Sequence, residues 1–188
     1  MLLSEVVVIA SSQEEDGNSE YLGVIQKKTG SLNCCGNKLG CEYAVKMVKS
    51  DIKDEIDQIY IYFSKGGAND APFRVKIYNE EEGRPSKLLH AVIVKPTKKL
   101  KKWNAIPISK KYITKDANIF YVAFEWLNSN EERFYYENVY KNICYGQTLG
   151  STRKSHGVSF FLKLFDDDVW RQGGEGIISV PMVKVKMK

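Results

Sequence analysis

The sequence of 188 residues lacks any apolar run of the length that a membrane-spanning helix needs, which is about 20 residues. The segment from Met1 to Glu5 has no basic cluster, and the apolar stretch from Val6 to Ala10 is too short for the core of a signal peptide. We therefore expect either a cytoplasmic protein or a segment cut from a longer exported chain. In either case, the chain would be peripheral to a membrane rather than spanning it.

Histidine is scarce, with only two in the chain. His90 is followed by Ala-Val-Ile and His156 by Gly-Val-Ser, so neither belongs to a zinc-peptidase motif, which needs several ligands at fixed spacing. Ser155 precedes His156, but neighbours in sequence rarely face each other, and no Gly-x-Ser-x-Gly elbow is present. The sequence predicts no catalytic residue, no enzyme activity and no cofactor.

Metal-ligating residues of other kinds are also few. The four cysteines are Cys34, Cys35, Cys41 and Cys144. Adjacent Cys34 and Cys35 are poorly placed to bond each other, which leaves Cys41 or Cys144 as partners in an oxidising compartment. Because a zinc site wants paired ligands at each end and Cys144 stands alone, we expect free or partly paired thiols rather than zinc.

Three consecutive acids, Asp166 to Asp168, precede a tryptophan late in the chain. They offer the oxygen ligands that calcium takes, but a calcium site wants spaced carboxylates together with carbonyl groups. A solvated turn is the favoured interpretation of this segment, and no metal site is predicted.

The sequence has no convincing helical periodicity of apolar residues. Instead, apolar and polar residues alternate with a period of two, which is typical of β-strands. Apolar and polar residues alternate from Phe73 to Tyr78, so Phe73, Val75 and Ile77 would face a core. The polar insert 79–85 contains Gly and Pro and predicts a hairpin loop of the longer kind, followed by a second strand over 88–94.

Other segments favour strands as well, whereas 29–40, which holds two of the four cysteines and three glycines, is expected to be a loop. The segment 119–127 is apolar on both faces and is expected to be central, with Phe120, Val122 and Phe124 in the core. The pattern predicts an all-β, antiparallel two-sheet sandwich resembling a jelly roll. Its further expected strands are 21–26, 42–49, 54–65, 103–108, 134–140, 157–165 and 176–188.

The net charge of +5 is concentrated in one stretch, because 91–115 holds eight lysines and no acid. Lys98-Lys99-Leu100-Lys101-Lys102 could attract a phosphate-bearing surface or nucleic acid. The run contains no interleaved stacking aromatics, however, and lysines also protect a sheet edge from association. We predict a solvated hairpin and no nucleic-acid partner.

Aromatic side chains near expected loops and strand ends are the candidate ligand-binding residues. Tyr136, Tyr140 and Trp170 could form a platform for sugar rings. Most aromatics, including Trp103 and Trp126, are instead expected in the core. A sugar-binding surface and a purely structural module differ in one respect, since only the sugar-binding surface needs a shallow exposed aromatic cluster with polar neighbours.

The first 18 residues are predicted to be an extension or linker from an upstream domain, and residues 19–188 the sandwich domain. The β-branched run from Val6 to Ile9 has no hairpin partner before the polar segment 11–19. We expect it to be mobile or to add to a sheet edge of a neighbouring domain or second copy. Deleting residues 1–18 should then change stability by less than about 1 kcal/mol.

Five segments in this order carry a resemblance: 73–78, 83–89, the strand-opening Trp103, 120–126, and a late turn leading to Trp170. Over about residues 40–175 the chain resembles the C-terminal β-sandwich of carboxypeptidase-regulatory-like-domain-containing proteins of Gram-negative bacteria. Glu5 to Ala10 is similar to the segment that follows the regulatory-like domain. In that family a Gly precedes the Trp and an Asp follows it; here those places hold Lys102 and Pro107.

The resemblance implies that the chain is the C-terminal part of a larger precursor exported to the cell envelope, in the periplasm or at the outer membrane. It further implies a non-catalytic structural or interaction module, packed against its upstream domain or an envelope partner. A carbohydrate-binding module is the alternative function, with carbohydrate as the ligand.

Overall fold

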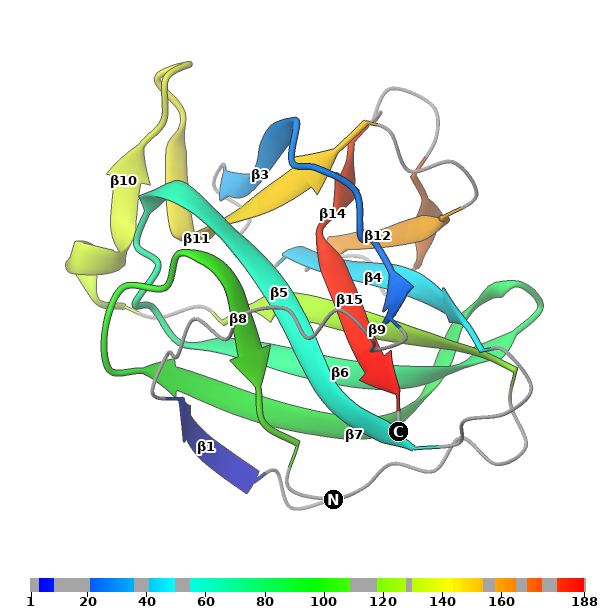
Figure 1. Ribbon diagram of the computed structural model, residues 1–188. Coiled ribbons are helices and arrows are strands. Elements are labelled where there is room, and N and C mark those ends of the chain that lie inside the picture. Colours follow the sequence, from blue (N-terminus) through cyan, green and yellow to red (C-terminus); the bar gives the residue numbers. More distant parts are fainter. Residues whose placement is uncertain are drawn as a thin grey trace.

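The structure is a computed structural model that describes residues 4–8, 21–35, 41–49, 55–108, 118–127, 130–153, 158–164, 169–173 and 179–187, with only the backbone of 4–8. Two β-sheets pack face to face (Figure 1). The elements are β1 Ser4–Val8, β2 Tyr21–Gly23, β3 Gly30–Cys35, β4 Cys41–Val48, β5 Ile56–Gly67, β6 Phe73–Glu81, β7 Arg84–Pro96, β8 Lys102–Ile106, β9 Ile119–Trp126, the 3-10 turn η1 Glu132–Phe134, β10 Tyr135–Glu137, β11 Ile143–Thr152, β12 Phe160–Leu164, β13 Arg171–Gln172, β14 Val180–Pro181 and β15 Val183–Met187.

The chain passes repeatedly from one sheet to the other. The seven-stranded sheet has the order β1-β7-β6-β9-β4-β12-β13, and the eight-stranded sheet has the path β10-β11-β5-β15-β2, with β3 and β14 on β11 and β8 on β5. Thus β5 lies in the second sheet, β6 and β7 in the first, β8 in the second again and β9 in the first. Among the described strands, all pairs are antiparallel except that of β1 with β7. The predicted all-β sandwich is confirmed.

The core between the sheets contains the six residues that alternation placed there. Phe73, Val75, Ile77, Phe120, Val122 and Phe124 are each at most 1% exposed. The rings of Phe73 and Phe124 stack with centroids 4.8 Å apart, and Phe63 of β5 meets both from the opposite sheet. Burial of such aromatic surface is the main stabilising contribution in a sandwich of this size.

Strand β9 is central, as its two apolar faces predict. Phe120 and Trp126 belong to the main core, whereas Tyr121 and Ala123 pack in a second cluster on the outer face of the seven-stranded sheet. Tyr121 also donates a hydrogen bond to the Gly83 carbonyl oxygen at 2.7 Å, which ties β9 to the β6–β7 turn.

Two sequence expectations about loops are wrong. The β6–β7 loop is a tight two-residue turn, since Glu81 pairs with Arg84. Glu82 and Gly83 both have positive φ, at 51° and 78°, which a two-residue hairpin turn following the strand twist requires. The expected cysteine loop over 29–40 contains β3, which pairs with β11.

The expectations for the N-terminal segment fall partly on residues with a described backbone. Ser4–Val8 adds to a sheet edge, but the edge is β7 of its own chain, over Val92 to Pro96. The proposed domain boundary between residues 18 and 19 lies outside the described residues. Among the residues that are described, no helix is long and apolar enough to cross a membrane.

Candidate functional site

The hairpin of β10 and β11 projects from one end of the eight-stranded sheet (Figure 1). Its turn is organised by Asn138, whose side-chain oxygen accepts hydrogen bonds from the backbone N–H groups of Tyr140 and Asn142 at 2.9 and 3.0 Å. Lys141 closes the turn with a φ of 64°. Asparagine favours such turns because its short side chain mimics a backbone acceptor.

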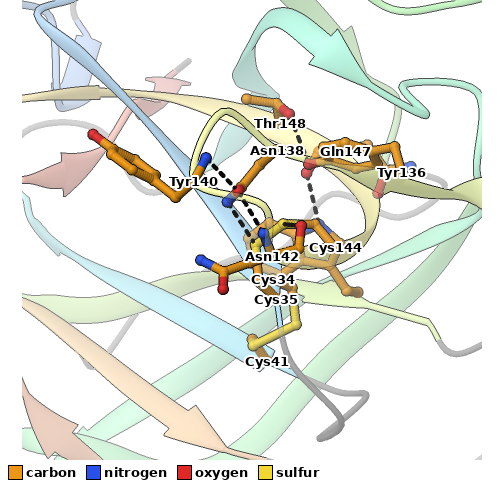
Figure 2. Close-up of a disulfide and its surroundings, with 11 residues drawn as sticks. Cys34, Cys35, Cys41, Tyr136, Asn138, Tyr140, Asn142, Cys144, Gln147 and Thr148 are labelled. Carbon is orange, nitrogen blue, oxygen red and sulfur yellow. Dashed lines mark hydrogen bonds between the residues drawn. A yellow bond between two sulfur atoms is a disulfide. The ribbon is translucent and has the colours of Figure 1, made fainter.

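One disulfide fixes the base of this hairpin, and a second one beside it joins β3 to β4. Cys35 of β3 bonds Cys144 of β11, and Cys34 bonds Cys41 at the start of β4 (Figure 2). Because β3 pairs with β11 in register, Cys35 and Cys144 face each other directly across the strands. No cysteine is free, so the expected free thiols are wrong, while the choice of Cys41 and Cys144 as partners for the adjacent pair is confirmed.

The tip of the hairpin is exposed and apolar. Val139 is 88% and Tyr140 80% exposed, and Ile143 at the start of β11 is 55% exposed. In Figure 2 the Tyr140 ring points away from the disulfides. These three large apolar side chains form an exposed apolar patch on a turn whose base is cross-linked by a disulfide.

Tyr136 lies on the same hairpin but has a different environment. Its hydroxyl forms a 3.0 Å hydrogen bond with the Thr148 hydroxyl (Figure 2). Burial raises the pKa of the Tyr136 phenol, and the bond to Thr148 lowers it in part. The ring lines a groove of about 390 Å³ together with Ser31, Asn33, Lys65, Gly66, Gly67, Glu137, Asn138, Val139 and Thr148.

A second groove, of about 340 Å³, adjoins the first at Ser31 and Lys65. Its lining consists of aromatic, hydroxyl and basic side chains from three segments: Lys28, Ser31, Tyr62, Phe63, Ser64, Lys65, Lys101 and Lys102. Gly150 of β11 makes room for the Tyr62 ring, because a Cβ at that glycine would lie 2.5 Å from it. Together the two grooves cross the outer face of the eight-stranded sheet.

Trp170, the third predicted ligand-binding residue, is not part of this surface. It packs against Tyr78 at a ring distance of 5.6 Å and joins the outer cluster of the seven-stranded sheet. The Lys163 ammonium lies 5.1 Å from the Trp170 ring centroid. The structure thus brings Tyr136 and Tyr140 together on one hairpin and places Trp170 on the other sheet.

A network of ion pairs surrounds Tyr78 on that outer face. Lys76 contacts the carboxylates of Glu42 at 2.9 Å and Glu125 at 3.1 Å, and Arg74 contacts Glu125 at 2.8 Å. The Tyr78 hydroxyl donates to Glu42 at 2.8 Å. Burial, and then the Glu42 carboxylate, raise the pKa of Tyr78 far above its usual value. Each carboxylate is thereby neutralised by cations from neighbouring strands.

The described part of the chain does not bring the remaining candidate catalytic or metal-binding residues together into a site. His90 is buried on β7 opposite Ile77, and in the part of the chain that the structure describes no three His, Cys, Asp or Glu side chains form a metal-binding group. The predicted turn at Asp166–Asp168 and the Ser155-His156 pair lie outside the described residues.

Sequence reasoning missed most of the groove. Lys28, Lys65 and Thr148 are separated in sequence and carry no motif. The four cysteines were the one available signal that residues near 35 and 144 meet. Comparisons with known proteins add no further site: no protein-family model, curated protein or solved structure matches this chain.

Proposed function

We propose that the chain is a non-catalytic interaction module of an exported cell-envelope protein, and that the β10–β11 hairpin is its contact element. The observation that carries this proposal is the exposed apolar tip, with Val139 and Tyr140 on a turn braced by the Cys35–Cys144 disulfide. Apolar side chains on a hairpin with a cross-linked base suit a protein partner, because less backbone freedom is lost on binding.

The two disulfides support export. Disulfides persist in oxidising compartments and are rare in the cytosol, where thiols stay reduced. The resemblance to carboxypeptidase-regulatory-like-domain proteins supports the same setting, the periplasm or outer membrane, with an upstream domain or another envelope protein as the partner. In this proposal the grooves and the hairpin bind, and no residue acts as a catalyst.

Photocrosslinking in the source cells tests the contact element. A photoreactive phenylalanine analogue at position 140 should give a discrete adduct with one partner protein, identified by mass spectrometry. The matched control carries the same analogue at exposed Lys87 and should give no such adduct. The same adduct at both positions, or none at position 140, would contradict the proposed role of the hairpin.

The state of the cysteines tests the compartment separately. Protein taken from source cells under acid quench should react with maleimide only after reduction, because all four cysteines are bonded. Four thiols that react without reduction would place the chain in a reducing compartment.

A carbohydrate-binding module is the second candidate function. It is favoured by one observation, namely the shallow groove in which half-buried Tyr136 stands among hydroxyl and amide side chains. Sugar rings pack on aromatic faces while their hydroxyl groups exchange hydrogen bonds with such neighbours. Direct titration with neutral and acidic oligosaccharides tests this candidate.

A further inference from the structure

The lysines of the second groove converge from three segments distant in sequence. Lys28 precedes β3, Lys65 lies near the end of β5, Lys101 directly precedes β8, and Lys102 is its first residue. Lys102 adopts a left-handed φ of 57° where the chain turns into β8, and the Asn104 side chain holds this turn by donating to the carbonyl oxygens of Lys101 and Lys102 at 3.1 and 2.9 Å. The lysine positions are therefore fixed by backbone geometry rather than by a flexible tail.

None of these four ammonium groups forms an ion pair with a residue that the structure describes, whereas lysines elsewhere on the surface do, such as Lys141 with Glu137 at 2.9 Å. The second groove has no acidic lining residue, and in the adjoining groove Glu137 is held by Lys141. Like charges gathered around low-dielectric walls raise the local concentration of anions.

The rest of the lining favours a sugar over a nucleic acid. Ser31 donates to the Ser64 hydroxyl at 3.0 Å, and the adjoining groove adds the Asn33 amide and the Thr148 hydroxyl. These groups both donate and accept, as sugar hydroxyl groups do. Single-stranded nucleic acid would need a row of stacking rings. The described lining of the basic groove has two aromatic residues, Tyr62 and Phe63, and Phe63 is 1% exposed with its ring packed in the core.

A neighbouring tryptophan is not available as a second platform. The Trp103 ring meets Tyr62 edge to face at 5.4 Å, and the Lys184 ammonium lies 4.6 Å from its centroid. Lys184 also lies 4.1 Å from the Tyr21 ring centroid, so its charge is already held by aromatic rings of this chain.

We propose that the joined grooves on the outer face of the eight-stranded sheet bind a chain of acidic sugars, an anionic polysaccharide, with Lys28, Lys65, Lys101 and Lys102 contacting its carboxylate or sulfate groups. This inference rests on the second candidate function and names its ligand class. The groove continues past Lys65 to Tyr136, so a polymer fits it better than one ring.

Calorimetric titration at 0.15 M salt with four probes tests the inference: a galacturonate hexamer, its neutral methyl ester, a sulfated hexasaccharide and a ten-nucleotide thymidine strand. We expect at least one acidic hexamer to bind, and the ester and the nucleotide strand to bind at least tenfold more weakly. Affinity for the acidic hexamer should fall as salt increases, because exposed charges are screened within about 8 Å at this ionic strength.

A pair of variants with equal charge change locates the site. Lys65→Gln/Lys101→Gln should weaken binding of the acidic hexamer about two- to thirtyfold, the range expected for the loss of two exposed ion pairs. Lys87→Gln/Lys99→Gln removes two exposed lysines that do not line the groove and should leave affinity within about twofold.

Each contrary outcome is distinguishable. Equal binding of the ester and the galacturonate hexamer would refute the proposal that the ligand is acidic, but it would still support the carbohydrate-binding candidate. Binding of none of the sugars overturns both. A nucleotide strand that binds as tightly as the acidic hexamers, or equal weakening by both double variants, overturns the assignment of this groove to an anionic polysaccharide.

Discussion

The Cys35–Cys144 disulfide should contribute more to stability than the Cys34–Cys41 disulfide, because the two bonds close loops of very different length. Their sequence separations are 109 and 7 residues. The chain-entropy relation gives about 4.8 kcal/mol for the long loop and about 2.4 kcal/mol for the short one. The short bond barely alters the long path between positions 35 and 144, so the two contributions are close to additive.

Two double variants measure this difference. Cys35→Ala/Cys144→Ala and Cys34→Ala/Cys41→Ala each remove one bond without leaving an odd thiol or a buried hydroxyl group. Urea denaturation should show that the first variant loses about 2 kcal/mol more free energy of unfolding than the second. An equal or larger loss in the Cys34–Cys41 variant would refute the reasoning from loop length.

The same variants separate global from local effects. Cys144 stands at the base of the β10–β11 hairpin, so loss of its bond should speed tryptic cleavage after Lys141 in the turn. Cleavage after exposed Lys87, in the distant β6–β7 hairpin, serves as the control. Equal acceleration at both sites would mean that the disulfide stabilises the whole fold without holding the hairpin in particular.

Two further predictions concern the ion-pair network. Glu42→Ala should lower the free energy of unfolding by about 1–3 kcal/mol, because the buried Tyr78 hydroxyl loses its acceptor while Lys76 keeps its second partner, Glu125. Glu137→Ala at an exposed pair should cost less than about 1 kcal/mol, and equal losses in urea denaturation would contradict this. Stability should also fall above pH 10. Burial raises the pKa of Tyr121 to about 12 and raises the pKa of Tyr78 above the usual 10 as well, so the folded state binds more protons there than the unfolded state does. Denaturation at pH 8 and pH 11 checks this, and unchanged stability would refute it.

The strand core could be predicted from the sequence because period-two alternation directly reports burial on one face. Phe73 to Ile77 and Phe120 to Phe124 illustrate this, since each apolar residue in the pattern is buried between the sheets. Strand β9 was identified as central by the same signal, with apolar residues on both faces. These inferences need only local sequence.

Strand β11 could not be predicted, although it holds the eight-stranded sheet together. Its sequence, Ile-Cys-Tyr-Gly-Gln-Thr-Leu-Gly-Ser-Thr, has the glycines and polar residues of a loop, yet it is almost wholly buried. Gly146 has a φ of 69° where the strand bulges, and Gly150 accommodates Tyr62. The glycines are needed because of a bulge and of a ring that packs from another strand, and neither can be inferred from the local sequence pattern.

The candidate site was only partly predictable for the same reason. The sequence indicates Tyr136 and Tyr140 as aromatics near a strand end, and both lie on the hairpin whose base carries the Cys35–Cys144 disulfide. The lysine run was interpreted as solvent-exposed, which is correct for Lys101 and Lys102 individually. What the run could not reveal is that Lys28 and Lys65 join them across the sheet.

On the outer faces of the two sheets, the basic side chains differ in whether they have described acidic partners. This difference favours one face over the other for binding an anion. On the seven-stranded sheet Lys76 and Arg74 are matched with Glu42 and Glu125, so bringing an external anion there would require breaking buried ion pairs. On the eight-stranded sheet the groove lysines have no described acid to give up, and the lining already supplies hydroxyl groups and the Tyr62 ring. An anion therefore gains attraction on this second face without displacing an internal partner. Among the described residues, the groove lysines that have no described acidic partner thus lie on the same sheet as the braced hairpin.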